Sequence, residues 1–236
     1  MTRSNSSYAH HDSLVQACVP TRIGEVRFEA GELGLRRIEM PAVDSSSLSQ
    51  LPIPKWIATA NLSPRMTLED LGLASRPTEV AQGQAVGVDS PDGAGESCDP
   101  ADLLVTVGRD IRLFFEGELA PSALWFGYPV DLSWCSGFAR GVMEGMRQIR
   151  PGETSTYGAL ASSAGKPRAP RAAGAVVGAN PLGPVIPCHR VVGAGGRLTG
   201  YGGGLPMKAA LLWLERNMLT GVRGLPHAVL KPGQRN

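Results

Sequence analysis

The sequence predicts an α+β fold in which a small antiparallel sheet precedes a helical region. Apolar and charged residues alternate near the N-terminus, whereas apolar residues recur at helical spacing in the second half. A stretch rich in Pro, Gly and Ser separates the two patterns. Apolar residues make up 42% of the 236 residues, which is enough for a sizeable core. We therefore expect two small domains.

The antiparallel sheet is predicted from residues 24–40. Apolar side chains alternate with charged ones from Gly24 to Ala30, which is the pattern of a half-buried strand. Gly31–Gly34 has the composition of a turn, and Leu35–Met40 is expected to be the return strand. Residues 1–20 are predicted to be a polar N-terminal tail.

Residues 41–100 show no sustained periodicity and are predicted to be a flexible insertion. Their last part, Thr78–Pro100, is rich in Gly, Asp, Ser and Glu and contains no Lys or Arg. Met66–Leu73 is an alternative short helix within this stretch. The mixed apolar pattern of Ala101–Gly117 fits a helix that follows it.

The second half of the chain predicts a helical domain. Thr156 is placed to cap a helix, and Pro170 and Pro206 suit the first turns of two others. We expect helices over Phe138–Arg150, Tyr157–Ala164, Pro170–Gly178 and Pro206–Asn217.

The two middle helices are short and are joined by Gly165–Arg168, which predicts a helix-turn-helix. The second of them consists mostly of small residues, including Ala172 and Gly174. Small side chains let a helix approach another surface closely. That surface is either DNA or the protein's own core.

The charge distribution points to a basic C-terminal region. The net charge is +2, but Phe138–Arg216 contains 10 Lys or Arg against 3 acidic residues. This excess fits binding to a polyanion, and a solvated basic surface without a partner is the alternative.

Cysteine spacing argues against a zinc site or a disulfide framework. The four cysteines are far apart and form no CxxC pair. Met1–Ser13 is polar and lacks the apolar core of a signal peptide, and no apolar run approaches the length of a membrane span. We therefore expect a reduced, cytoplasmic protein with no metal and no membrane contact.

Cys188 is the candidate nucleophile. It lies beside His189 in the run Pro187–Val191, and Glu215 ends an apolar helix downstream. Thiolate is a soft nucleophile, but a free cysteine has a pKa of about 8.5 and needs help to ionise at neutral pH. A histidine oriented by a carboxylate supplies that help. Ordinary cysteine hydrolases usually bring their base from a distant segment, so adjacent Cys and His argue against that class.

From about Trp134 to Asn217 these motifs, together with Asn180-Pro181 and Gly200–Gly204, resemble the O6-alkylguanine-DNA alkyltransferases. This family is also called the methylated-DNA–protein-cysteine methyltransferases. The resemblance implies a ribonuclease H-like N-terminal domain over residues 21–133, a DNA-binding alkyltransferase domain over 134–220 and a tail over 221–236.

The resemblance also implies the activity. Such a protein repairs double-stranded DNA by irreversible transfer of the alkyl group from O6-alkylguanine to its own cysteine, here Cys188. The sequence leaves open whether O4-alkylthymine is also a substrate. We expect the protein to act as a monomer without a cofactor.

The family's functional positions map onto this sequence residue by residue. Cys188, His189 and Glu215 match its catalytic relay, which includes a water. Arg171 matches the arginine that fills the space left by the flipped base, on a recognition helix that also carries Ala172 and Gly174. The expected substrate-binding residues are Tyr157, Asn180, Tyr201 and Gly202.

These substrate-binding residues have distinct implied roles. Tyr157 turns the target nucleotide and helps to protonate guanine, and Tyr201 is a second pocket tyrosine. Asn180 fixes the turn before the cysteine loop. Gly202 replaces a serine that is common in the family, and its backbone N–H can still donate to the guanine oxygen.

Two other classes of protein share some of these features. One is a non-catalytic sensor that flips alkylated bases and recruits other repair proteins, but such a sensor lacks the reactive cysteine. The other is a transcriptional regulator that uses the helix-turn-helix, but no second DNA-binding module is visible in the sequence.

Overall fold

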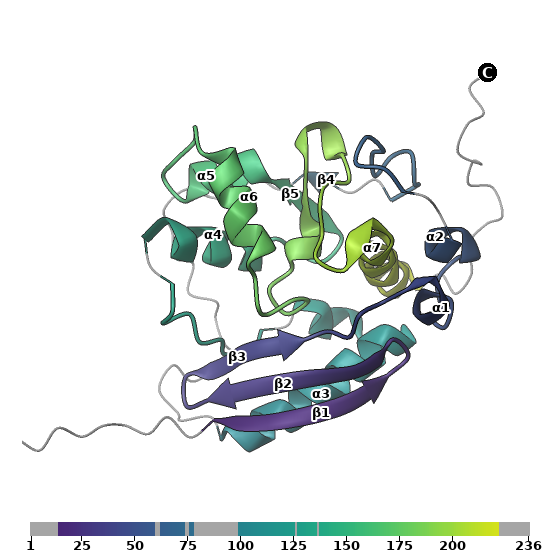
Figure 1. The fold of residues 1–236 in the computed structure, drawn as a ribbon, viewed down its shortest axis with the longest axis vertical. Helices are drawn as coiled ribbons and strands as arrows, with labels where there is room; N and C mark the ends of the chain where they lie inside the picture. The colour runs from purple at the N-terminus through teal and green to yellow at the C-terminus, as the bar shows by residue number, and fades with distance from the viewer. Residues whose placement is uncertain are drawn as a thin grey trace, which may run out of the picture.

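The computed structural model describes residues 14–59, 62–73, 76–77, 99–125, 127–135 and 137–221. The first part of the predicted N-terminal tail, most of Thr78–Pro100 with Cys98, and nearly all of the C-terminal tail lie outside these residues. The described residues form an α+β fold, as predicted. A three-stranded sheet with one long helix behind it lies beside a mainly helical region (Figure 1).

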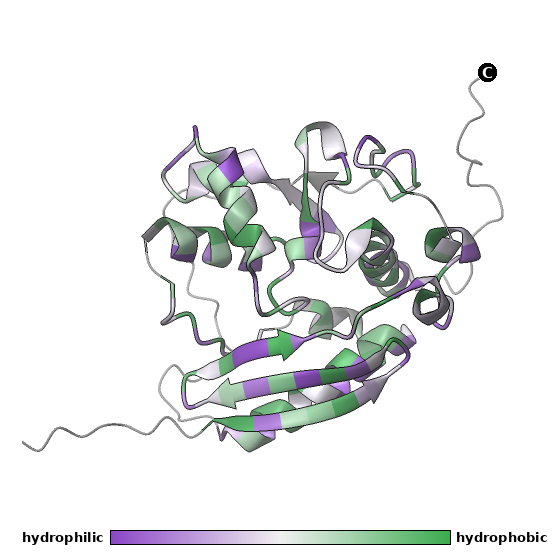
Figure 2. Cartoon of the chain, viewed as in Figure 1, coloured by the Kyte–Doolittle hydropathy of each residue, from purple (hydrophilic) through white to green (hydrophobic). Residues whose placement is uncertain are grey.

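The N-terminal sheet contains the predicted hairpin. β2 (Gly24–Gly31) and β3 (Gly34–Glu39) pair antiparallel, with Phe28 opposite Ile38. Val26, Phe28 and Ala30 are buried, so the alternation in the sequence correctly predicted which face of β2 packs against the core. The same alternation is visible as colour stripes along β2 in Figure 2.

The prediction of a polar tail over residues 1–20 is wrong for its last part. β1 (Val15–Thr21) pairs antiparallel with β2 and forms the edge of the sheet. Val15, Ala17 and Val19 alternate toward the core, a pattern that the polar residues before it concealed. The strand lies close to helix α3, because a Cβ on Gly108 would come within 2.6 Å of Cγ2 of Val19.

Helix α3 (Pro100–Glu116) confirms the helix expected over Ala101–Gly117. The side chain of Asp99 accepts a hydrogen bond from the N–H of Ala101, and Gly117 ends the helix with a left-handed backbone. In Figure 1, α3 runs along the face of the sheet that is turned away from the viewer.

The described part of the predicted flexible insertion is packed instead. It contains α1 (Ser45–Leu48) and α2 (Lys55–Thr59), both of which contact α7 (Gly204–Thr220). The buried side chains are spaced too irregularly to give a period, but each finds apolar neighbours in the core: Leu48, Leu51, Ile57, Leu68, Leu71 and Leu73.

Met66–Leu73 is a series of turns and not a helix. The side chain of Asp70 accepts from the N–H of Thr67, and the Thr67 hydroxyl accepts from the N–H of Asp70. The N–H of Leu68 donates to the carbonyl of Gly196, and that of Leu198 donates to Met66. This segment is therefore tied to the loop at 193–198.

The four helices expected in the second half are all confirmed. Thr156 caps one of them by accepting from the N–H of Ala159 at 3.1 Å. The helices are α4 (Gly137–Arg147), α5 (Tyr157–Ser163), α6 (Pro170–Gly178) and α7 (Gly204–Thr220). Within the described residues, no helix is long and apolar enough to span a membrane.

A second, parallel sheet lies among these helices and was not predicted. Its strands are β4 (Arg76–Pro77), β5 (Glu153–Thr156) and β6 (Val191–Val192), in that order. Strands of two to four residues are too short to show a period in the sequence.

The N-terminal sheet is joined to the helical region along β3. The N–H of Leu35 donates to the carbonyl of Pro129 at 3.0 Å, and the N–H of Ile38 donates to the carbonyl of Pro181 at 2.8 Å. Gly34 has φ of +114°, and a Cβ there would lie 2.4 Å from the Pro129 oxygen. Pro181 belongs to the loop that leads to Cys188, so the sheet is positioned against that loop.

Candidate active site

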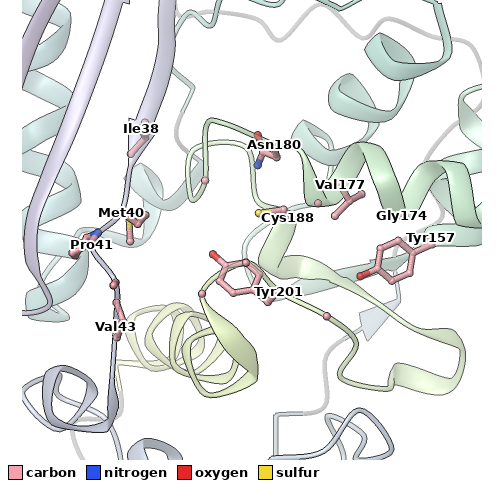
Figure 3. Close-up of a pocket in the computed structure, with 16 residues that line it drawn as sticks. Ile38, Met40, Pro41, Val43, Tyr157, Gly174, Val177, Asn180, Cys188 and Tyr201 are labelled. Atoms are coloured by element: carbon pink, nitrogen blue, oxygen red, sulfur yellow. The ribbon is translucent and has the colours of Figure 1, made fainter.

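Cys188 begins a 3₁₀ helix (Cys188–Arg190) between the loop after α6 and β6. Its side chain is half-buried and lines a cavity of about 610 Å³. A Cβ built on Gly183 would lie 3.4 Å from Sγ of Cys188, 3.9 Å from Nδ2 of Asn180 and 4.0 Å from the Tyr201 oxygen. These three side chains therefore converge on one point, as Figure 3 shows.

Asn180 braces the loop that carries the cysteine. Its Nδ2 donates to the carbonyl of Ile186 at 2.8 Å, and its Oδ1 accepts from the N–H of Leu182 at 3.1 Å. Both ends of the amide are used, so this side chain spans the turn from α6 to Cys188.

His189 and Glu215 form a buried pair. Nε2 of His189 lies 2.8 Å from Oε1 of Glu215, and the two side chains are 0% and 1% exposed. Glu215 is therefore a buried carboxylate and not a solvent-exposed charge at the end of a helix. Among the described residues, no protein group lies within hydrogen-bonding distance of Nδ1 of His189.

Arg190 is a site component for which the sequence had suggested no role. Its guanidinium donates to both oxygens of Glu215, at 2.6–3.0 Å, and to the carbonyls of Ile149 and Leu124 at 2.7 and 3.0 Å. Arg190 and His189 lower the pKa of Glu215 to about 2 against its burial. The carboxylate is therefore ionised at neutral pH.

Burial sets the protonation of the Cys188–His189 pair. It raises the pKa of the Cys188 thiol, and interactions with Asn180, Lys208 and Tyr201 oppose this effect. Burial lowers the pKa of His189, and Glu215 opposes that change. Near neutral pH the resting pair is therefore a thiol and a neutral imidazole, and the thiol must lose its proton during reaction.

Lys208 is the second component that the sequence analysis missed. It is buried in α7, and its Nζ donates to the carbonyls of Val191 at 2.5 Å and Thr199 at 3.0 Å. Burial lowers its pKa to about 8. The position of Lys208 among the apolar residues of α7 could have indicated a structural role, because a lysine is rarely buried unless its charge has partners. Lys208 therefore holds together the two ends of the segment from Val191 to Thr199.

The cavity brings together all four predicted substrate-binding residues. Tyr157, Asn180, Tyr201 and Gly202 all line it, and so does Gly174 of α6. The Thr199 hydroxyl donates to the Tyr157 oxygen at 3.1 Å, which leaves the Tyr157 O–H able to donate elsewhere.

The residues expected to touch DNA are divided between the cavity and the surface. Gly174 lies against the Tyr157 ring, since a Cβ there would be 3.6 Å from Cδ1. Arg171 and Ala172 are exposed in the first turn of α6, and Lys166 and Arg168 are exposed just before it. Other cations of the basic region are not at the surface, because Arg190 and Lys208 are buried.

The described residues contain no cluster of three His, Cys, Asp or Glu side chains that could hold a metal ion. The three described cysteines, Cys18, Cys135 and Cys188, are all free thiols.

Comparison with known proteins decides the family. Residues 137–217 match the model of the 6-O-methylguanine DNA methyltransferase DNA-binding domain. The methylated-DNA–protein-cysteine methyltransferase of Methanosarcina barkeri is 50% identical over 111 residues, which are 47% of this chain and 67% of that protein. The chain belongs to the methylated-DNA–protein-cysteine methyltransferase family. The corresponding protein of Mycolicibacterium paratuberculosis is 48% identical over 108 residues, or 46% of this chain and 62% of the relative.

Solved methyltransferase structures extend the similarity to the N-terminal sheet. Mycobacterium tuberculosis OGT in complex with DNA superposes with a TM-score of 0.54 at 26% identity, covering 86% of this chain and 93% of that one. A second structure, of the O6-methylguanine methyltransferase of the same species, superposes with a TM-score of 0.53 at 26% identity, covering 87% of this chain and 94% of that one. The fold of this family member is thus shared well beyond the segment that the sequence relatives match.

Proposed function

We propose that the protein repairs O6-alkylguanine in double-stranded DNA by moving the alkyl group irreversibly onto its own Cys188. One observation carries this proposal: the Cys188 thiol opens into a cavity while His189 and Glu215 are buried beside it. The known relatives are named for the same transfer, although the aligned segment spans only 62% of the first of them.

The reaction is a displacement at the alkyl carbon. A bond forms between Sγ of Cys188 and that carbon while the carbon–O6 bond breaks, and its electron pair stays on guanine. The thiol proton passes to His189 through a water, for which Nδ1 is the nitrogen not engaged by Glu215. Guanine gains one proton, which balances the proton that the thiol loses.

Tyr157 is the proposed donor of the proton that guanine gains. A neutral base is a far better leaving group than its anion, so a phenol next to the base assists bond breaking. Gly202 and Tyr201 line the cavity with Cys188. The Gly202 N–H is the proposed donor to the guanine oxygen, and Tyr201 is the proposed second tyrosine of the pocket. Asn180 acts through the loop as a positioning residue.

Duplex DNA is the proposed partner. α5 and α6 act as a helix-turn-helix, with α6 as its recognition helix. Arg171 enters the duplex from the first turn of α6 and fills the space of the flipped nucleotide, and Ala172 and Gly174 allow close approach. The exposed cations before α6 contact phosphates. The solved structure of Mycobacterium tuberculosis OGT in complex with DNA supports this assignment.

The remaining features of the proposal follow the family. The N-terminal domain, which begins with β1 at Val15 and extends to about residue 133, is ribonuclease H-like, the domain at 134–220 carries the chemistry, and the protein works as a cytoplasmic monomer. It needs no cofactor or metal.

The deciding experiment mixes the protein with a duplex that carries one O6-methylguanine. A thioether is stable toward water and toward ordinary protein side chains, so transfer should stop at one methyl per protein. Peptide mass analysis should place the methyl on Cys188 and on none of Cys18, Cys98 or Cys135. Cys188→Ser should bind the lesion but transfer nothing, because a serine hydroxyl is barely ionised. Multiple turnover, or binding by the unmutated protein without transfer, would overturn the proposal.

A further inference from the structure

We infer that Met40–Val43, which connects the N-terminal sheet to α1, is the wall of the active-site cavity that selects for alkyl groups larger than methyl. This inference rests on the proposed function, because it names a substrate class for the same site. It also gives a role to the first residues of the stretch that the sequence had suggested was flexible.

The cavity has two sides with Cys188 between them. Tyr157 and Val177, which come from α5 and α6, lie on one side, next to the elements assigned to DNA (Figure 3). Met40 and Val43 lie on the opposite side of the cysteine. A guanine that enters from the α6 side leaves this second side for the substituent on its O6 atom.

The wall is fixed at both of its ends. Before it, Ile38 of β3 donates its N–H to the carbonyl of Pro181 at 2.8 Å, which ties the strand to the cysteine loop. After it, the Asp44 side chain caps α1 by accepting from the N–H of Ser47 at 2.8 Å. The ring of Pro41 packs closely against Gly24, because a Cβ added to Gly24 would lie 3.2 Å from two of the ring carbons.

The chemistry of the wall suits an apolar substituent. Met40, Pro41 and Val43 are all half-buried at the cavity, and none carries a charge. Such side chains gain from removing apolar ligand surface from water. Methionine is flexible and polarisable and packs well against aromatic rings.

Glycines leave room for that substituent at the rim of the cavity. A Cβ on Gly200 or Gly202 would meet no heavy atom within 4 Å. The cavity, at about 610 Å³, is within the range of sites that hold whole small molecules. A benzyl group is therefore a suitable probe for the wall.

The test compares two duplexes that differ only in carrying O6-methylguanine or O6-benzylguanine. Single-turnover rate constants give a benzyl-to-methyl ratio for each variant. Met40→Trp fills the wall and should lower this ratio at least tenfold, whereas Met40→Ala enlarges the cavity and should not lower it. Val105→Trp is the matched control, because Val105 is 73% exposed on α3, and it should leave the ratio unchanged.

The outcomes separate this inference from the proposed function. Absence of transfer from both duplexes by the unmutated protein would overturn the proposed function itself. Transfer from the methyl duplex with none from the benzyl duplex would overturn only the inference. An unchanged ratio in a folded Met40→Trp variant would also overturn it. If that variant does not fold, Val43→Trp replaces it with the same expected loss.

Discussion

Nε2 of His189 lies 2.8 Å from Oε1 of Glu215, and the same carboxylate oxygen accepts a hydrogen bond from Arg190 at 2.6 Å. All three side chains are at most 2% exposed. Glu215 therefore has two functions: it orients the imidazole, and it neutralises a buried guanidinium that also holds the carbonyls of Ile149 and Leu124.

Glu215→Gln should reduce the reactivity of Cys188. Glu215 raises the pKa of His189 against burial, so its loss leaves a weaker base for the thiol proton. The pH at which half of Cys188 reacts with a small alkylating reagent should rise. Glu144→Gln, which removes only the surface ion pair with Arg140, is the control and should leave the profile unchanged. An unchanged profile in Glu215→Gln would restrict Glu215 to its structural function.

The buried Glu215 carboxylate should make the free energy of unfolding depend on pH in the acidic range. The pKa of Glu215 is lowered from 4.5 to about 2, so the folded state binds fewer protons than the unfolded chain between these values. The stabilisation is present above about pH 4.5 and is lost as the pH falls toward 2. Glu215→Gln lacks this titration and leaves Arg190 buried without its counter-ion, which costs on the order of 3–5 kcal/mol.

Urea unfolding at pH 7 and pH 3 measures this effect. The unmutated protein should lose more unfolding free energy between the two pH values than the Gln variant does. Equal losses would show that Glu215 is not the group whose protonation destabilises the fold.

Lys208→Met should also raise the pH at which Cys188 reacts. The positive charge of Lys208 lowers the pKa of the thiol, and its own pKa of about 8 keeps it charged at neutral pH. Above pH 8 the lysine loses its proton, so the reactivity of Cys188 in the Met variant should approach that in the unmutated protein. Lys208→Arg retains the charge and should shift the pH profile less. A Met variant that reacts like the unmutated protein would mean that Lys208 only holds the Val191 and Thr199 carbonyls.

Local patterns in the sequence predicted the elements that fold through local interactions. The strand at Gly24–Gly31 has an alternating pattern, and Thr156 and Pro170 begin helices where capping chemistry places them. β1 was missed because the polar residues before it dominated the interpretation of residues 1–20. β6 is only two residues long, so its pairing with β5 depends on tertiary structure.

The sequence predicted those residues of the candidate site that belong to a recognisable motif. Cys188 and His189 are adjacent, and the resemblance supplied Glu215 and the cavity residues. Arg190 donates hydrogen bonds to the carbonyls of Leu124 and Ile149, which are more than 40 residues away in the sequence. A periodic pattern in the sequence does not predict contacts between such distant positions. Met40 and Val43 reach the cavity through the pairing of β3 with the Pro181 loop, which likewise follows from the fold.

Arg171→Ala should slow repair of duplex DNA more than repair of a single strand. The side chain is exposed in the first turn of α6, and its proposed function is to replace the flipped base. A single-stranded oligonucleotide with O6-methylguanine needs no extrusion from a stack. We expect at least a tenfold loss on the duplex and a small loss on the single strand. Arg37→Ala, an exposed arginine on β3, is the control, and equal losses on both substrates would reject the role of Arg171.

Gly183→Ala should preserve the fold and suppress the reaction. The added methyl carbon would lie 3.4 Å from Sγ of Cys188, an ordinary van der Waals distance, so no atom needs to move. It would occupy the point where Cys188, Asn180 and Tyr201 converge, which is space that the attacking sulfur and the alkyl carbon require. The single-turnover rate should fall by roughly tenfold, equivalent to about 1.4 kcal/mol in the barrier. Gly158→Ala adds a methyl in α5 at 3.7 Å from the Thr156 hydroxyl, outside the cavity, and should leave the rate unchanged. A Gly183→Ala protein that melts normally and reacts at the unmutated rate would show that the alkyl group approaches the sulfur from another direction.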